Sequence, residues 1–225
     1  MTKRKREIGA RGFSEKYWQE NYSDPVSMDC VGNSKEHVRY LKAVFALEYV
    51  DVSCVIDFGF GPGQLLKEVA RVFLPHQLYG IEPSKYIFDI VKNKIKLKIV
   101  ESMKIKLEQI DLRSWCEINK DSSKVFDLGL CTSVFQYLSQ DELNFILPIL
   151  AQKVKYLYCC VPTDKELDRQ VSELQFLDRF AFRRSRNFYY KIIGKHFTFV
   201  AGRILESKVH FDEVNTHFTD LLFRF

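Results

Sequence analysis

Apolar and amphipathic segments alternate along the middle of the chain, between residues 53 and 162. Five short apolar runs have the length and composition of buried strands: 53–58, 77–82, 107–112, 126–131 and 156–161. Segments that repeat apolar residues at helical spacing lie between them, among them 64–73, 84–95 and 140–153. Strands of this kind, separated by amphipathic helices, predict a parallel sheet that is covered on both faces.

Two helices are predicted before this alternation begins. The first, over residues 14–22, carries Tyr17 and Trp18, and the sequence leaves open whether they cover a ligand or pack in a core. The second is expected to open on a capping box, because Asn33 is followed three residues later by Glu36.

The last third of the chain predicts further helices and two late strands. Apolar residues between Leu167 and Ala181 fall on one helical stripe, and Gly194 is placed to end a helix that begins near Ser185. Residues 197–205 and 219–225 predict strands that can form an antiparallel pair. We therefore expect an α/β fold with a doubly wound, mostly parallel sheet of about seven strands, the last ones including an antiparallel one.

Composition places the chain among single-domain intracellular proteins. At 225 residues and 46% hydrophobic, it is long enough for one buried core and short for two. No stretch approaches the roughly 20 apolar residues of a membrane span. No apolar segment follows the charged N-terminus, so a secretory signal is not expected and a cytoplasmic location is.

The cysteines and histidines do not predict a metal site. The six cysteines show no Cys-x-x-Cys spacing, and several lie inside apolar runs, which is typical of core thiols in a reducing compartment. The five histidines are scattered and form no cluster with cysteines along the sequence.

The net charge of +5 is concentrated in two stretches. Residues 1–12 carry a net charge of +4, and residues 178–195 carry +5. Such stretches are commonly solvated, but they can also attract a polyanion. Basic stretches 3–11 and 179–195 therefore leave nucleic acid open as a partner.

The turn after the first strand carries a D-x-G-x-G-x-G motif, formed by Asp57, Gly59, Gly61 and Gly63. Glycines in such a turn let the backbone approach a ligand, and the helix behind them offers free N–H groups. A dinucleotide site needs G-x-G-x-x-G, and Gln64 stands where its third glycine would be. A carboxylate ahead of the glycines repels a pyrophosphate and suits a ligand with an ammonium group.

This motif resembles the first motif of class I S-adenosylmethionine-dependent methyltransferases. In that family an acid at the end of the second strand binds the ribose hydroxyls, and Glu82 stands 19 residues after Gly63, where such an acid is expected. The resemblance covers roughly residues 40–162.

Two later strands extend the resemblance. The family's third strand ends in an acid followed by a side chain that packs on the adenine, and Asp111 with Leu112 matches that pair. Glu101 can instead end the third strand, although we favour Asp111. The fourth strand, 126–131, ends at Cys131 and is similar to the family's fourth motif.

The resemblance implies S-adenosylmethionine as the cofactor and methyl transfer as the activity. The residues expected to bind the cofactor are Asp57, Gly59, Gly61, Gly63, Glu82, Asp111, Leu112 and Cys131. The expected organisation is a basic leader (1–13), an N-terminal helical lid (14–50) and a cofactor-binding domain (51–225) with an acceptor-side insertion around 163–195. No motif singles out a catalytic residue or an oligomeric state.

The methyl acceptor is not named by any motif. Arginines and aromatic residues interleave in 179–190, and they can bind an anionic or flat acceptor by bidentate and stacking contacts or form an amphipathic helix with a solvated arginine face. The compact size and the lack of a recognisable nucleic-acid module favour a small acceptor. The alternatives are an RNA or protein methyltransferase and a non-catalytic binding module with the same fold. The Asp/Asn-Pro-Pro-Tyr signature of amino-group methylation on nucleic-acid bases is absent after the fourth strand.

Overall fold

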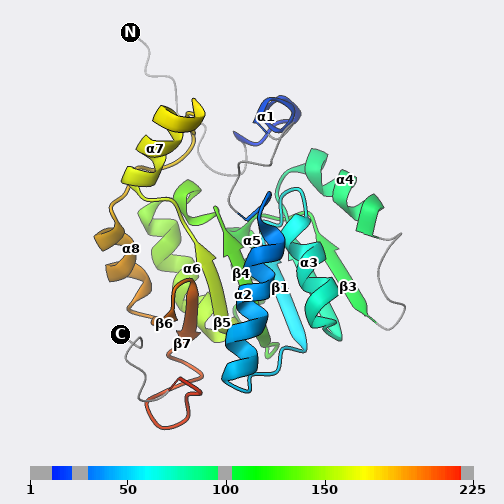
Figure 1. The fold of residues 1–225 in the computed structure, drawn as a ribbon, viewed down its shortest axis with the longest axis vertical. Helices are drawn as coiled ribbons and strands as arrows, with labels where there is room; N and C mark the ends of the chain where they lie inside the picture. The colour runs from blue at the N-terminus through cyan, green and yellow to red at the C-terminus, as the bar shows by residue number, and fades with distance from the viewer. Residues whose placement is uncertain (1–11, 22–29, 96–102, 219–225) are drawn as a thin grey trace.

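A seven-stranded sheet lies between two layers of helices in the computed structural model, which describes residues 12–21, 30–95 and 103–218 (Figure 1). The strands are β1 (Cys54–Phe58), β2 (Gln77–Ile81), β3 (Lys104–Glu108), β4 (Phe126–Thr132), β5 (Val154–Cys160), β6 (Phe197–Ala201) and β7 (Ile204–Ser207). Their order across the sheet is β3-β2-β1-β4-β5-β7-β6. The first five strands are parallel, and β7 runs antiparallel to β5 and β6. The predicted α/β fold with a mostly parallel, doubly wound sheet is confirmed.

Helices cover both faces of this sheet, as the continuous apolar strands require. They are α1 (Glu15–Asn21), α2 (Ser34–Leu47), α3 (Gln64–Phe73), α4 (Lys85–Ile95), α5 (Leu112–Asn119), α6 (Gln140–Lys153), α7 (Asp164–Leu174) and α8 (Arg186–Ile193), with a short 3-10 helix η3 (Phe135–Tyr137). One core holds apolar residues of α2, α3 and α4, and the other those of α5, α6 and α8. Alternate residues of a strand enter opposite cores, so Tyr158 belongs to the first and Leu157 to the second.

The chain order reverses between β1 and β4, at the centre of the sheet. In an open α/β sheet, ligands bind in the crevice outside the carboxyl ends of the strands at such a switch point. The glycine turn follows β1 and Glu82 follows β2, so both lie at this edge.

The third strand differs from its prediction. It spans Lys104–Glu108 rather than 107–112, and Asp111 follows it as the N-cap of α5. Both Asp111 oxygens bind Ser114: Oδ1 accepts from its backbone N–H at 2.9 Å and Oδ2 from its hydroxyl at 2.8 Å. Glu101 precedes the strand in sequence, so it does not end it.

The antiparallel pair at the end of the sheet also differs from its prediction. Residues 197–205 were expected to form one strand, but they contain β6 and the start of β7, which turn back on each other through Gly202 and Arg203. The other predicted partner, 219–225, lies outside the described residues, as does the predicted basic leader up to residue 11. The late antiparallel strands are therefore a hairpin within residues 197–207.

Two helix-end predictions were wrong. The side chain of Asn33 does not cap α2; its Oδ1 accepts the backbone N–H of Cys30 at 2.7 Å. Helix α7 ends at Leu174, because Gln175 adopts the left-handed conformation, so the predicted stripe from Leu167 to Ala181 is interrupted. In the part of the chain that is described, none of the helices has the length and apolar character needed to cross a membrane.

Candidate functional site

The glycine turn between β1 and α3 requires glycine for two separate reasons. Gly59 and Gly63 have φ values of 81° and 78°, which side chains other than glycine rarely adopt. A Cβ at Gly59 would lie 2.8 Å from a methyl group of Val134, and one at Gly63 would lie 2.9 Å from a methyl group of Val91. Close packing and backbone conformation therefore require glycine at both positions.

Two buried carboxyls meet at this turn. Asp57, inside β1, is 1% exposed, and Glu82, directly after β2, is 4% exposed. Burial, reinforced by the nearby Glu82 carboxylate, raises the pKa of Asp57 to about 8. Burial also raises the pKa of Glu82 to about 7, against the effect of hydrogen bonds to its carboxylate from the backbone N–H groups of Ser84 (2.9 Å) and Gly61 (3.0 Å). The pair is thus set to ionise when a cation or a set of donors arrives.

A cavity of about 500 Å³ opens in front of these carboxyls, and we call it the first cavity. This volume lies within the range of about 300–1,000 Å³ that is usual for small-molecule sites. Among the described residues, cysteines and tyrosines aside, the ionisable side chains of its wall are Glu20, Asp57, Glu82, Asp111, Glu166, Arg169 and Asp178. Six carboxyls against one guanidinium make this cavity acidic, which favours a ligand that carries positive charge.

Most of the predicted cofactor-binding residues gather on this cavity. Its wall includes Asp57, Gly59, Gly61, Glu82, Asp111 and Leu112. Gly63 stands just behind the wall as the N-cap of α3. Cys131 is fully buried inside β4, and the next residue, Thr132, lines the cavity in its place. The structure therefore brings six of the eight predicted residues together on one cavity, and Thr132 lines it in place of Cys131.

An aromatic group from the N-terminal helix closes one side of the first cavity. The indole N–H of Trp18 donates to the Ser84 hydroxyl at 2.9 Å, and a Cβ at Gly61 would lie 3.5 Å from its ring. The Phe13 ring packs against Tyr17 and Tyr137, with centroid separations of 5.1 and 4.8 Å. Trp18 and Phe13 line the cavity, so α1 both packs on the domain and borders the site.

A tyrosine–aspartate pair that no motif indicated also lines the first cavity. The Tyr137 hydroxyl, in η3 after β4, donates to Asp178 Oδ2 at 2.8 Å. Burial raises the pKa of Asp178, although hydrogen bonds from Tyr137 and from backbone N–H groups oppose this effect. The two residues are 41 positions apart, so only the fold brings them together.

A second cavity of about 820 Å³ adjoins the first. The two share Ser133, Pro162, Glu166, Arg169 and Gln170 on their walls. The ionisable side chains that line the second cavity, cysteines and tyrosines aside, are Glu166, Arg169, Arg186 and Arg203. Three guanidinium groups against one carboxylate make the second cavity basic.

Two arginines of the segment 179–190 make contacts within the protein. Arg183 forms an ion pair with Asp168 on α7. The guanidinium of Arg184 stacks on the rings of Phe182 and Phe188, at 4.5 and 4.8 Å from their centroids. Neither lines the second cavity, whereas Arg186 does.

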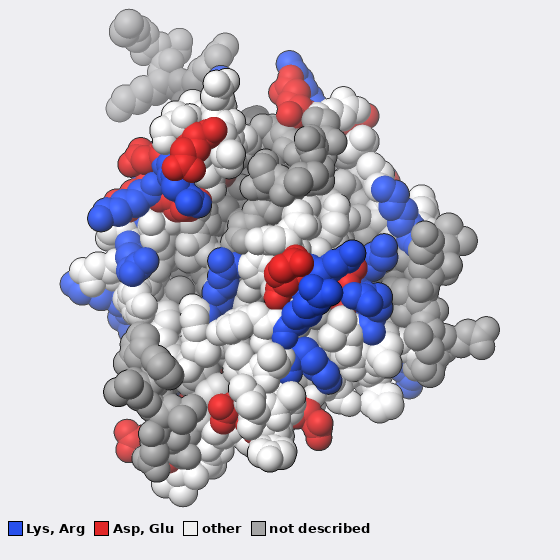
Figure 2. Space-filling model, viewed as in Figure 1, with Lys and Arg blue, Asp and Glu red and all other residues white. Residues whose placement is uncertain are grey.

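Basic residues also gather on a surface that the two basic stretches of the sequence, 3–11 and 179–195, did not predict. Figure 2 shows Lys and Arg side chains gathered over α2 and α3. The exposed basic residues of these helices are Lys35, Arg39, Lys42, Lys67 and Arg71. They come from two helices separated by β1, so they do not form a run in the sequence.

Comparison with known proteins agrees with this arrangement. Residues 55–155 match the family of methyltransferase domains. The chain resembles magnesium protoporphyrin IX methyltransferase from Synechocystis PCC 6803 with bound SAH, at 18% identity and a TM-score of 0.56, over 77% of this chain and 81% of that one. It also resembles the N-methyltransferase NodS from Bradyrhizobium japonicum WM9, at 14% identity and a TM-score of 0.55, over 78% of this chain and 97% of that one. No curated protein sequence matches the chain.

The methyltransferase domain of bacterial CtHen1 is a further structural relative, at 18% identity and a TM-score of 0.54, over 76% of this chain and 99% of that one. At such identities the likeness is one of fold. Residues 55–155 of the chain therefore match a methyltransferase domain, and the chain shares its fold with enzymes that were crystallised with SAH or SAM.

The residues of the first cavity fit S-adenosylmethionine, the cofactor that the sequence predicts. Three buried oxygens on its wall have no hydrogen-bond partner among the described residues: Asp57 Oδ1, Gln64 Oε1 and Gln136 Oε1. Buried acceptors of this kind are normally satisfied. S-adenosylmethionine offers an ammonium group, two ribose hydroxyls and an adenine amino group, all of which are donors, and its sulfonium adds positive charge that suits the acidic wall.

Proposed function

We propose that the chain transfers the methyl group of S-adenosylmethionine to a small acceptor that carries an anionic group and binds in the second cavity. The observation that carries this proposal is the reversal of charge between two cavities that share a wall. The acidic first cavity suits the cationic cofactor, and the arginines of the second suit an anion. Guanidinium groups bind carboxylates and phosphates in a bidentate manner.

In this proposal the cofactor lies across the carboxyl edge of β1 and β2. Asp57 accepts from the ammonium group, and Glu82 accepts from the ribose hydroxyls while it keeps its backbone donors. Leu112 packs on the adenine, and an Asp111 oxygen accepts from the adenine amino group. Their common position on the first cavity supports these roles.

The bound cofactor supplies a methyl carbon on a positively charged sulfur, which is already an excellent leaving group. The chain mainly positions the acceptor heteroatom in line with that carbon. The heteroatom forms the new bond to the methyl carbon as the bond to sulfur breaks, and a hydroxyl or ammonium acceptor also loses a proton. Tyr137 and Asp178 are placed to take it, because Tyr137 can receive a proton while its own passes to Asp178.

The test is a methyl-release assay with the purified chain and four acceptor pools: anionic metabolites, neutral and cationic metabolites, RNA, and protein. We expect turnover in the anionic pool, with Arg186→Gln raising KM there and leaving the affinity for S-adenosylmethionine unchanged. Lys191→Gln on the same helix is the matched control, because Lys191 is exposed outside the cavity wall.

Turnover confined to RNA or protein would contradict the small acceptor. Such an acceptor could contact the basic surface of α2 and α3, and its binding would weaken steeply with salt. Tight binding of S-adenosylmethionine without turnover in any pool would contradict catalysis and favour a binding module.

A further inference from the structure

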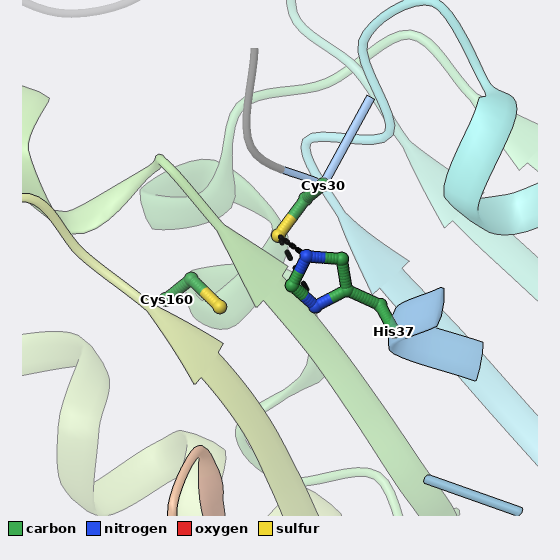
Figure 3. Close-up of side chains that lie close together, drawn as sticks. All are labelled: Cys30, His37 and Cys160. Carbon is green, nitrogen blue, oxygen red and sulfur yellow. Dashed lines mark hydrogen bonds between the residues drawn. The ribbon is translucent and has the colours of Figure 1, made fainter. Parts of the chain in front are cut away.

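Three side chains that are far apart in sequence converge between the two cavities. Cys30 precedes α2, His37 lies in its first turn, and Cys160 ends β5. Figure 3 shows the Cys30 sulfur against the His37 ring, and the Cys160 side chain nearby on β5. Their sulfur and nitrogen atoms all lie within 4.8 Å of one another, and Cys30 and His37 are buried.

We propose that Cys30, His37 and Cys160 form a binding site for a thiophilic divalent cation of the zinc class. Two cysteines and one histidine are a donor set that zinc prefers. Ligands about 2.3 Å (sulfur) and about 2.0 Å (nitrogen) from a tetrahedral ion lie about 3.6–3.8 Å apart. Cys30 Sγ lies 3.7 Å from His37 Nε2 and 4.0 Å from Nδ1, so the spacing suits an ion once the imidazole ring turns Nε2 toward the sulfurs.

The histidine has the supporting contact that a metal ligand needs. Its Nδ1 is hydrogen-bonded to the hydroxyl of Tyr158, which comes from the same face of β5 as Cys160. With the Nδ1 proton donated to that hydroxyl, Nε2 is the ring nitrogen that can bind the ion. Histidine ligands almost always hold their second ring nitrogen in this way.

A guanidinium nitrogen already stands beside the three donors. Arg203 Nη1 lies 3.2 Å from His37 Nε2, 3.3 Å from Cys160 Sγ and 3.9 Å from Cys30 Sγ. The three donor atoms thus already lie beside one positively charged side chain. Arg203 lines the second cavity and covers the donors on the side that faces it. A bound ion requires Arg203 to swing toward that cavity, which leaves the fourth position of the ion open on the same side.

The charges balance at such a site. Both thiols release a proton as the ion binds, so two thiolates neutralise one divalent cation and the imidazole stays neutral. The ion would join the N-terminal region to β5, since Cys30 and His37 come from one and Cys160 from the other. The site rests on its own geometry and does not depend on the identity of the methyl acceptor.

The experiment measures the zinc content of the purified full-length chain by mass spectrometry of the metal, followed by titration of the metal-free, reduced chain with Co²⁺. We expect about one equivalent of zinc, as one tetrahedral site would hold, and a thiolate-to-cobalt charge-transfer band. Cys30→Ser, Cys160→Ser and His37→Gln should each lower the affinity at least tenfold. Tyr158→Phe should lower it about tenfold, as is usual for the partner of a ligand.

Cys159→Ser is the matched control. Cys159 is the sequence neighbour of Cys160, but it packs with the core on the opposite face of the sheet, so zinc binding should be unchanged. If the reduced wild-type chain takes up no zinc and shows no charge-transfer band, the proposal is wrong, whether or not Cys30 and Cys160 form a disulfide instead. Equal zinc binding by Cys30→Ser, Cys160→Ser and the wild type would also overturn it. The cobalt spectrum of the wild type decides the question even if a ligand variant fails to fold.

Discussion

The two adjoining cavities differ in charge and in how the chain builds them. The first cavity draws Asp57, the glycine turn and Glu82 from one stretch of sequence, a single β-α-β unit. The second draws its arginines from α7, from the start of α8 and from the β6–β7 hairpin, which are separated by up to 34 positions. The first is acidic and the second basic.

This difference separates the two halves of the proposed reaction. In this proposal a local motif is enough to hold the cofactor, whereas the acceptor side depends on how distant segments pack. Changes at the cofactor-binding residues of the first cavity should therefore alter cofactor affinity, and changes at the Tyr137–Asp178 pair or in the second cavity should alter turnover or acceptor binding. Four predictions test this separation.

The largest effect is expected at the Tyr137–Asp178 pair. Asp178→Asn removes the proton acceptor, and kcat should fall by about 100-fold or more, as loss of a general base usually causes. The dissociation constant of S-adenosylmethionine, measured by calorimetry, should change less than about twofold, since a base contributes to the transition state and not to cofactor binding. Asp168→Asn, an exposed carboxylate on α7, is the control. An unchanged kcat in Asp178→Asn would show that the hydrogen bond between Tyr137 and Asp178 only holds the segment before α8 in place.

The next effect concerns the buried carboxyls of the first cavity. Asp57→Asn and Glu82→Gln should weaken S-adenosylmethionine binding about 10- to 100-fold, because hydrogen bonds to charged groups contribute about 1.5–3 kcal/mol. The ligand-free variants should be at least as stable as the wild type, since each removes a carboxyl that is costly to ionise. Calorimetry and thermal unfolding check both outcomes, with Asp89→Asn on α4 as an exposed control. Wild-type affinity in both variants would remove the basis for placing the cofactor here.

A smaller effect is expected on the basic side. Arg186→Gln should raise the KM for an anionic acceptor about tenfold, which corresponds to the loss of about 1.4 kcal/mol of binding. The affinity for S-adenosylmethionine should not change, because Arg186 lines only the second cavity. A loss of cofactor affinity with no change in KM would show that the two cavities do not divide the reaction as proposed.

The last effect is a pH dependence of stability, which is measured by unfolding rather than by binding or turnover. Folding raises the pKa of Asp57 from 3.8 to about 8 and that of Glu82 from 4.5 to about 7. The folded chain therefore binds more protons than the unfolded chain in this window, and its stability falls as the pH rises toward 8. Thermal unfolding without ligand should show a Tm lower by several degrees at pH 8.5 than at pH 6, corresponding to a few kcal/mol.

The Asp57→Asn variant should lose most of this pH dependence, because an amide does not ionise. Saturating S-adenosylmethionine should raise Tm more at pH 8.5 than at pH 6, since its positive charge favours the ionised carboxyls. A Tm shift on ligand addition that is equal at both pH values would contradict the coupling between ionisation and binding.

Much of the fold could be predicted from the pattern of apolar residues. Helices α3 and α6 have the bounds that helical spacing predicted, and β4 extends its prediction by one residue. The prediction of β3 failed because residues 107–112 span the end of β3, the connecting residues and the start of helix α5. The apolar pattern does not mark where a strand ends when a helix follows so closely. The hairpin of β6 and β7 was missed because its two-residue turn lies within an apolar segment.

The sequence by itself determined that the residues of the predicted cofactor side come together. Asp57, the glycines and Glu82 lie within one strand–turn–helix–strand unit, so backbone geometry and spacing specify how they meet. Only the tertiary structure decided the rest: which arginines line the second cavity, that Tyr137 donates to Asp178, and that Cys30 and His37 face Cys160. Contacts between distant segments depend on how the helices pack against the sheet, and this packing cannot be predicted from the spacing of residues along the chain.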